Sequence, residues 1–162
     1  MADQVDRILE QWRAEKPELD VSPMAVIGRL SRTALAVESR LSGTFARHCL
    51  DSSSFDVLAT LLRSGSPYRI TPVELARDAM ISTSAVAQRL NKLEGRGLVL
   101  REVNPDDGRG TLVSLTDAGR ELIEAALPDH LEAEGAITAA LSVEEQTHLA
   151  LLLQRINEAA SS

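Results

Sequence analysis

A change of hydrophobic period in the middle of the chain constrains the fold more than any other feature of this sequence. Residues 71–78 and 82–95 have the spacing of two short amphipathic helices, separated by a turn of three residues. The first begins with Thr71-Pro-Val-Glu74, a capping box with proline at the first helical position. Residues 99–103 and 111–115 then alternate as two strands around a tip rich in Asn, Asp and Gly. This order predicts a winged helix-turn-helix.

Amphipathic helices are predicted on both sides of this winged unit. Apolar spacing and capping residues place them over 3–15, over about 25 residues from Ser22, over 53–64, over 117–140 and from 142 onward. The expected fold is mainly α with a small β-hairpin: five helices, the hairpin, then two helices. Within one structural domain we expect N-terminal helices (1–50), the winged helix-turn-helix (51–116) and C-terminal helices (117–162).

The second of these helices carries a long apolar seam. Its members recur in steps of three and four residues, the spacing of a helix that packs along another helix. They are Ile27, Leu30, Ala34, Val37 and Leu41. The partner helix lies either in the same chain or in a second subunit, and the seam alone leaves both open.

Composition excludes several classes of protein. An aromatic content of 2% is too low for the stacking platforms of single-strand and RNA binders. No stretch approaches the roughly 18 apolar residues of a membrane helix, and the first residues are acidic, unlike a secretory signal. The single Cys49 forms no internal disulfide, so we expect a cytoplasmic protein. No phosphate loop, dinucleotide motif or metal-ligand spacing appears, so we expect no enzyme, no cofactor and no metal.

The net charge of −7, taken alone, argues against a nucleic-acid partner, but its distribution along the chain changes this interpretation. Residues 121–162 contain Arg155 alone against eight acidic residues, so they carry the whole excess. Residues 82–110 contain five basic and four acidic residues. The predicted winged unit is therefore free to turn a basic side toward phosphates.

The predicted helix over 82–95 has two distinct faces. At about 100° per residue, Val86, Leu90 and Leu93 mark its buried side. Gln and Asn side chains can bond adenine edges, and Ser can serve either base of a pair. The opposite side offers these residue types: Ser84, Gln88 and Asn91, flanked by Ala87 and Lys92. Any amphipathic helix has a polar outside, but the tight turn before it and the hairpin after it favour a helix that reads DNA.

Two arginines point away from that polar side. Arg89 lies at the edge of the buried side, and Arg101 shares a strand face with Val99 and Val103, toward the core. An unpaired buried charge is strongly disfavoured, so both arginines need anionic partners. Asp56 is a candidate partner, although an aspartate near a helix start is also explained by the helix dipole.

Together these residues resemble the MarR family of bacterial winged-helix transcriptional regulators. The similarity spans nearly the whole chain, and its most specific segments are 71–76, 83–99, 104–109 and 115–120. The resemblance implies an obligate homodimer, a repressor, on a palindromic double-stranded DNA operator with half-sites about 10 base pairs apart. It places the wing-tip Arg109 in the minor groove. Gly108 stands where many relatives carry a second basic residue, so a weaker wing contact is expected. The residues implied in the major groove are Thr83, Ser84, Ala87, Gln88, Asn91 and Lys92.

The N-terminus resembles the urate-responsive branch of this family, which has an additional first helix with a Trp. That resemblance implies a ligand site formed by Trp12, Asp56, Arg89 and Arg101. A guanidinium and a Trp ring suit a planar anion such as urate, or another small organic acid. An anion that pulls Arg89 is expected to tilt the recognition helix. A coupling of about 1–3 kcal/mol would weaken DNA binding roughly five- to 150-fold.

Two other functions stay open at this point. Redox sensing through Cys49, beside His48, requires an exposed thiol with a depressed pKa. A buried Cys49 would instead be an ordinary small core residue. A winged helix that serves only protein contact would show no salt-dependent DNA binding.

Overall fold

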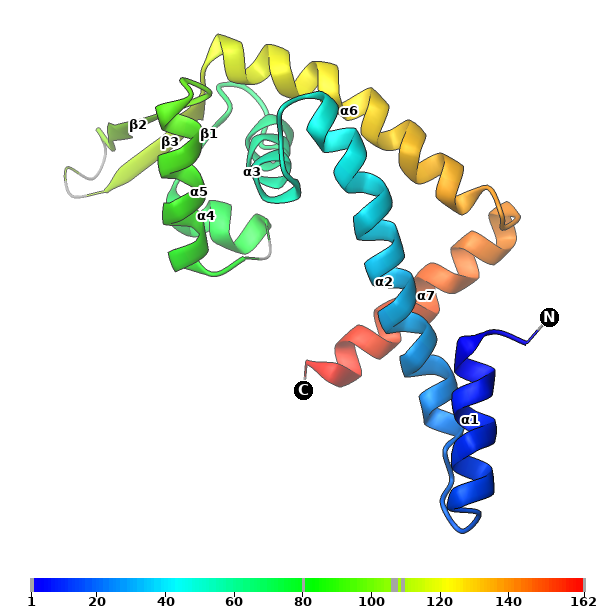
Figure 1. Ribbon diagram of the computed structural model, residues 1–162. Helices are drawn as coiled ribbons and strands as arrows, with labels where there is room; N and C mark the ends of the chain where they lie inside the picture. Colours follow the sequence, from blue (N-terminus) through cyan, green and yellow to red (C-terminus); the bar gives the residue numbers. More distant parts are fainter. Residues whose placement is uncertain (1, 80, 106–107, 109, 162) are drawn as a thin grey trace. The chain divides into compact units, whose positions relative to one another are not determined.

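The computed structural model describes residues 2–79, 81–105, 108 and 110–161, apart from the side chain of Thr83 (Figure 1). The predicted fold class is confirmed, and a two-residue strand is added to it. Among the described residues, no helix is both long and apolar enough to cross a membrane. The elements are α1 (Gln4–Glu15), α2 (Ser22–Arg47), α3 (Ser52–Arg63), β1 (Arg69–Ile70), α4 (Pro72–Asp78), α5 (Thr83–Gly95), β2 (Val99–Val103), β3 (Thr111–Leu115), α6 (Asp117–Thr138) and α7 (Val143–Ala160).

The chain divides into two compact units, residues 1–40 and residues 41–162. In the first unit, α1 packs on the beginning of α2 through a small core of Val5, Leu9 and Val21. The two helices approach closely at Gly28, where an added Cβ would lie 3.3 Å from Val5 Cγ1. A side chain at that position would therefore push the helices apart.

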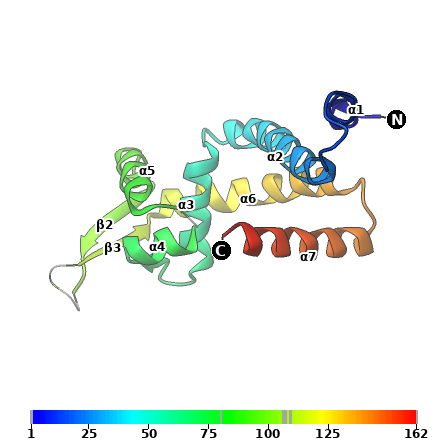
Figure 2. The same ribbon diagram turned by 90° about the horizontal axis from the view of Figure 1, so that it is seen from below.

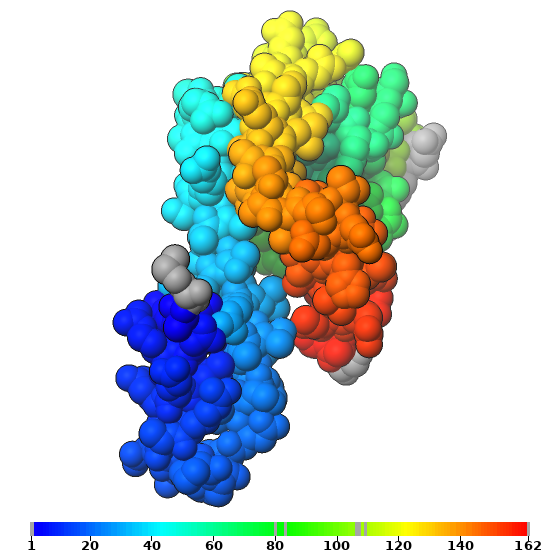
Figure 3. Space-filling view, turned by 90° about the vertical axis from the view of Figure 1, so that its right-hand side faces the viewer, coloured from blue at the N-terminus to red at the C-terminus, as the bar shows by residue number. Residues whose placement is uncertain are grey.

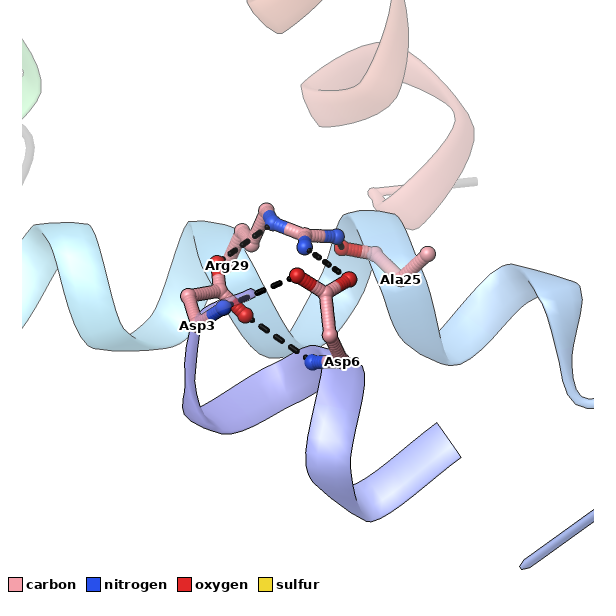
Figure 4. A network of polar contacts seen from close by, with 4 residues as sticks. All are labelled: Asp3, Asp6, Ala25 and Arg29. Atoms are coloured by element: carbon pink, nitrogen blue, oxygen red, sulfur yellow. Dashed lines mark hydrogen bonds and ion pairs between the residues drawn. The ribbon is translucent and has the colours of Figure 1, made fainter. Parts of the chain in front are cut away.

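Ion pairs also tie α1 to α2 (Figure 4). Asp3 and Asp6 form a capping box at the start of α1. Arg29 of α2 donates from Nε to Asp3 Oδ2 at 2.9 Å and from Nη2 to Asp6 Oδ1 at 2.6 Å. Hydrogen bonds from the cap backbone and from Arg29 hold the pKa of both carboxyl groups below their ordinary values. One arginine thus anchors the first turn of α1 to its neighbour.

The second unit contains the winged helix-turn-helix and a larger core. Its antiparallel sheet has the order β1-β3-β2, with Arg69 opposite Ser114 and Val99 opposite Leu115. Figure 2 shows α3, α4 and α5 gathered beside this sheet, with α6 continuing from β3. The fully buried apolar side chains come from all of these elements: Val57, Leu58, Leu61, Leu75, Val86, Leu93, Val113 and Ile123.

The base of the hairpin is locked to α6 by a close backbone approach. Thr116 caps α6, donates from Oγ1 to the Gly97 carbonyl at 2.7 Å, and donates from its N–H to the Leu98 carbonyl at 3.2 Å. The first turn of α6 passes so near that a Cβ at Gly119 would overlap the Leu98 carbonyl group. A glycine at this position therefore lets the hairpin sit against α6.

The predicted helix starts are confirmed, with one shift. Thr71 and Glu74 cap each other, with Thr71 N–H donating to Glu74 Oε2 at 2.8 Å. Ser142 caps α7 in the same way. α3 begins one residue earlier than predicted, because Asp51 rather than the serine run supplies its cap.

One expectation about burial is wrong, and one open alternative is decided. Val103 is 69% exposed, because β2 leaves the core as it approaches the hairpin tip. Of the two alternatives for Cys49, the structure shows the exposed one. Cys49 has a positive φ of 53° where α2 ends, and the chain turns there as the Leu50 N–H donates to the Phe45 carbonyl at 2.9 Å. That turn points the cysteine away from the core.

Candidate DNA-binding surface and ligand site

The two faces of α5 lie as the sequence predicted. Val86, Leu90 and Leu93 are buried, at most 2% exposed. Ser82 caps the helix, accepting the Ala85 N–H at 3.2 Å, so α5 begins directly after the turn that follows α4. The outward face is small and polar, as contact with base edges requires. Its exposed residues are Ser84, Ala87, Gln88, Asn91 and Lys92.

The wing is a regular two-stranded hairpin up to its tip. Val103 pairs with Thr111, and Asn104 N–H donates to the Gly110 carbonyl at 2.9 Å. Arg69 of β1 pairs with Glu102 at 3.2 Å, so it reinforces the hairpin from the side of the sheet. The predicted contact at Arg109, like the side chain of Thr83, lies outside the described residues, and both stay predictions.

Arg89 and Asp56 lie near each other, as two of the four predicted ligand residues should. Arg89 is half-buried, and its Nη1 atom is buried with no hydrogen-bond partner among the described residues. Asp56 is exposed by surface area, yet the atoms packed around its carboxyl raise its pKa. The positive charges of Arg89 and Arg63 oppose that shift. A guanidinium nitrogen without a hydrogen-bond partner therefore lies in the neighbourhood of an aspartate whose pKa is raised.

Arg101 has a different partner from the one considered in the sequence. Its Nε donates to Glu94 Oε2 at 3.0 Å, and its backbone N–H donates to Glu94 Oε1 at 3.3 Å. The hydrogen bond from Arg101 lowers the pKa of Glu94. The predicted need for an anion is thus met by Glu94 on α5, not by Asp56. Trp12 is 41% exposed and belongs to the N-terminal unit, so its role in the site stays a prediction.

Two polar groups in this part of the fold were not predicted from the sequence. His130 of α6 packs its ring against Phe55 and Phe45, with centroids 4.5 Å and 5.3 Å apart, and its Nδ1 is buried without a partner. The Oγ atom of Ser54 is also buried without a partner, within the described part of the chain. His130 follows the buried residues Ile123 and Ala126 at helical spacing, so a polar residue on an apolar face was the available signal.

An ion pair links the recognition helix to α3. Lys92 of α5 pairs with Asp51, the residue that caps α3. Both side chains are about half exposed, 54% for Lys92 and 46% for Asp51. Lys92 was predicted to contact DNA, whereas no role was predicted for Asp51.

α7 leaves its apolar side uncovered in the single chain. None of its described residues is buried, and Leu149, Leu151, Leu152 and Leu153 are 38–55% exposed. Figure 3 shows this helix, orange to red, open on the face toward the viewer. Leu149 and Leu152 also line a groove of about 370 Å³ together with Leu141 and His148. Leu149, Leu152 and Leu153 recur on one side of the helix, and an exposed apolar patch of this kind is typical of an interaction surface.

A tight turn between two helices, a polar outward face on the second, and a hairpin locked behind it define a winged-helix DNA-binding protein. Known proteins agree. A family model described as the MarR family matches residues 50–110. The chain is 41% identical over 155 residues to the HTH-type transcriptional regulator PecS from Dickeya dadantii, covering 96% of this chain and 93% of that protein.

Solved structures extend the likeness to DNA complexes. Sco3205, a MarR family transcriptional regulator from Streptomyces coelicolor in complex with DNA, has a TM-score of 0.80 at 27% identity, covering 87% of this chain and 89% of that one. A mutant of MarR from E. coli complexed with operator DNA has a TM-score of 0.74 at 26% identity, covering 85% and 99%. The chain belongs to the MarR family, and it is a DNA-binding transcriptional regulator.

Proposed function

We propose that this regulator is a homodimeric repressor of palindromic operators, which a small anionic ligand such as urate or an organic acid releases from DNA. The main support for a ligand site is the buried Nη1 atom of Arg89, which has no hydrogen-bond partner among the described residues. A guanidinium is charged at every physiological pH, and a buried donor atom without a hydrogen-bond partner is costly. An anion bound there would remove this cost.

The position of Arg89 connects such a ligand to DNA. Arg89 lies on α5, directly after Gln88 and two residues before Asn91, so a pull on its guanidinium acts on the helix that carries the DNA face. Asp56 on α3 competes for the same guanidinium, and a ligand anion would repel it. Ser54 Oγ and His130 Nδ1 are further groups that a ligand could satisfy. Differential binding worth about 1–3 kcal/mol would weaken DNA binding roughly five- to 150-fold.

The uncovered apolar side of α7 supports the dimer. Leu149, Leu152 and Leu153 lie on one side of this helix and are each at least 38% exposed, and an exposed apolar patch marks an interaction surface. Terminal helices that pair with a second copy would cover this surface and place two copies of α5 about one turn of DNA apart, which suits a palindrome. Sedimentation of the protein at several concentrations tests the dimer separately from the ligand.

Ligand binding is tested through Trp12, the one tryptophan of the chain. Its fluorescence is titrated with urate and with citrate, corrected for absorption, and release of a fluorescent duplex, selected from a random library by the unmodified protein, is followed in parallel. We expect a saturable change and DNA release with at least one of these anions. Arg89→Gln should abolish both, while the matched control Arg96→Gln, an exposed arginine at the end of the same helix, should retain the response. A protein that binds the duplex yet responds to neither anion contradicts the ligand assignment.

Exposure of Cys49 favours redox control as a second candidate function. The thiol follows His48, whose Nε2 lies 2.8 Å from Asp129 Oδ2, and it is open to solvent. Peroxide should then release DNA from the unmodified protein but not from Cys49→Ser. Equal release from both proteins would exclude Cys49 as the sensor.

A further inference from the structure

Two cations of α5 and its C-terminal cap are exposed in the described part of the chain, and one of them is paired. Lys92 forms its ion pair with Asp51, and Arg96 stands at the C-terminal cap. Arg89 is half-buried on the other side of the helix. Lys92, beside Gln88 and Asn91, is therefore the cation best placed to approach a phosphate. In the protein without DNA, however, it is already paired with a carboxylate.

Asp51 is a firmly placed acid. It caps α3, and its Oδ1 accepts the Ser54 N–H and the Ser53 hydroxyl, both at 2.7 Å. Its Oδ2 is left for Lys92. Partial burial alone would raise its pKa, but hydrogen bonds from Lys92, Ser53 and Ser54 outweigh burial and hold the pKa well below its ordinary value. Asp51 is therefore charged throughout the pH range in which the protein works.

We propose that Asp51 is a positioning residue for DNA binding. In the DNA-bound protein it keeps Lys92 in an ion pair, so the positive charge of Lys92 is not available to the DNA phosphates. A lysine neutralised by a fixed carboxylate displaces no counterion from DNA, because the pair has no net charge to offer. The α3 cap thus sets how strongly the recognition helix adheres to DNA of any sequence. This inference rests on DNA binding alone and does not require the ligand.

The salt dependence of binding measures this effect directly. Each phosphate that a protein neutralises on duplex DNA adds about 0.9 to the steepness of log K against log salt concentration. If Lys92 is freed from Asp51, the slope of log K against log salt concentration should therefore become steeper by about 0.9 for each copy, or by about 1.8 for the proposed dimer. Between about 50 mM and 200 mM salt, an added slope of 1.8 corresponds to a further loss of roughly 12-fold in affinity. A residue with a purely structural role would not change this slope.

The experiment measures binding of a fluorescent duplex, selected from a random library by the unmodified protein, at several salt concentrations. Asp51→Asn removes the charge and keeps a side chain that caps helices as well as Asp does. Asp51→Ser provides a second neutral cap should the first variant fold poorly. Glu121→Gln, an exposed acid on α6, controls for the general effect of one added positive charge. Lys92→Gln is made in both backgrounds.

We expect Asp51→Asn to bind more tightly at low salt with a steeper slope, and Glu121→Gln to leave the slope unchanged. Lys92→Gln should leave the slope of the otherwise unmodified protein unchanged and restore it in the Asp51→Asn background. Two results overturn the proposal. One is an unchanged slope in both Asp51 variants. The other is a shallower slope for Lys92→Gln alone, since Lys92 would then already contact phosphate in the natural complex.

Discussion

Replacing Gly119 by alanine should weaken the fold at the base of the wing. The new Cβ would overlap the Leu98 carbonyl oxygen and stand 2.9 Å from its carbonyl carbon, against 3.4–4 Å for an ordinary contact. The clashing atoms belong to the backbone of Leu98, which cannot move aside as a flexible side chain could. Relieving the contact with the oxygen requires either α6 or the start of β2 to move by about 1 Å or more, into a region that is already close-packed.

The magnitude follows from what that movement disturbs. Overpacking of this kind costs about 1–3 kcal/mol. The two bonds of Thr116, to the Gly97 carbonyl at 2.7 Å and to the Leu98 carbonyl at 3.2 Å, depend on the same approach. Losing both costs about 2 kcal/mol, at about 1 kcal/mol each. Alanine returns about 1 kcal/mol through its better helix propensity. The net loss is about 2–4 kcal/mol, which lowers Tm by roughly 4–16 °C in a protein of this size.

The same helix offers a matched control. Gly135 of α6 has no atom within 4 Å of an added Cβ, so Gly135→Ala gains helix propensity without a clash. Thermal unfolding followed by circular dichroism, at one protein concentration, should show Gly135→Ala at or above the natural Tm and Gly119→Ala well below it. A Gly119→Ala protein as stable as the Gly135→Ala protein would refute the close approach between α6 and Leu98.

Three further predictions concern other parts of the chain. Leu93→Ala, at a fully buried side chain of α5, should cost about 2–5 kcal/mol in urea unfolding, and a smaller loss would mean that the site collapses around the cavity. Arg29→Gln should raise hydrogen exchange in α1 and leave α5 unchanged, because its ion pairs reach only Asp3 and Asp6. Lowering the pH should also weaken the attachment of α1, because it acts on the same two carboxylates. The folded pKa values of Asp3 and Asp6 are depressed, so their contribution is complete above the ordinary pKa of 3.8 and is lost as pH falls below it. Protection of α1 from exchange, relative to the intrinsic rate at each pH, should fall below about pH 4 in the natural protein, and Arg29→Gln should weaken that dependence.

The sequence predicted the elements well because their signals are local. Capping residues such as Thr71 and Ser142, the spacing of Val86, Leu90 and Leu93, and the alternation around the wing each depend on a few adjacent residues. β1 was missed because two residues are too short to show any period. The seven helices predicted from apolar spacing and capping residues differ from the observed helices only by small shifts of their ends.

Pairings across the fold were harder to predict, because nothing local marks them. Arg101 needed an acid, but the choice of Glu94 over Asp56 depends on how β2 crosses α5. The pairing of Lys92 with Asp51 joins residues 41 positions apart. Asp51 itself was hidden by the serines that follow it, which are equally good helix caps. The ligand and DNA residues were proposed from resemblance, and the geometry adds Ser54 and His130 to the groups to be tested.

A helix with no fully buried residue among those described ties folding to abundance. Most of the stability of a helix such as α7 comes from packing of its apolar face, not from helix propensity. Covered by a second copy, as proposed, it would gain its order from association, so its helicity would follow the law of mass action. Dilution would then melt the C-terminal end of the chain before the winged core. A cell holding few copies of this regulator would contain, besides free dimers, chains whose last helix had unravelled and become open to proteases.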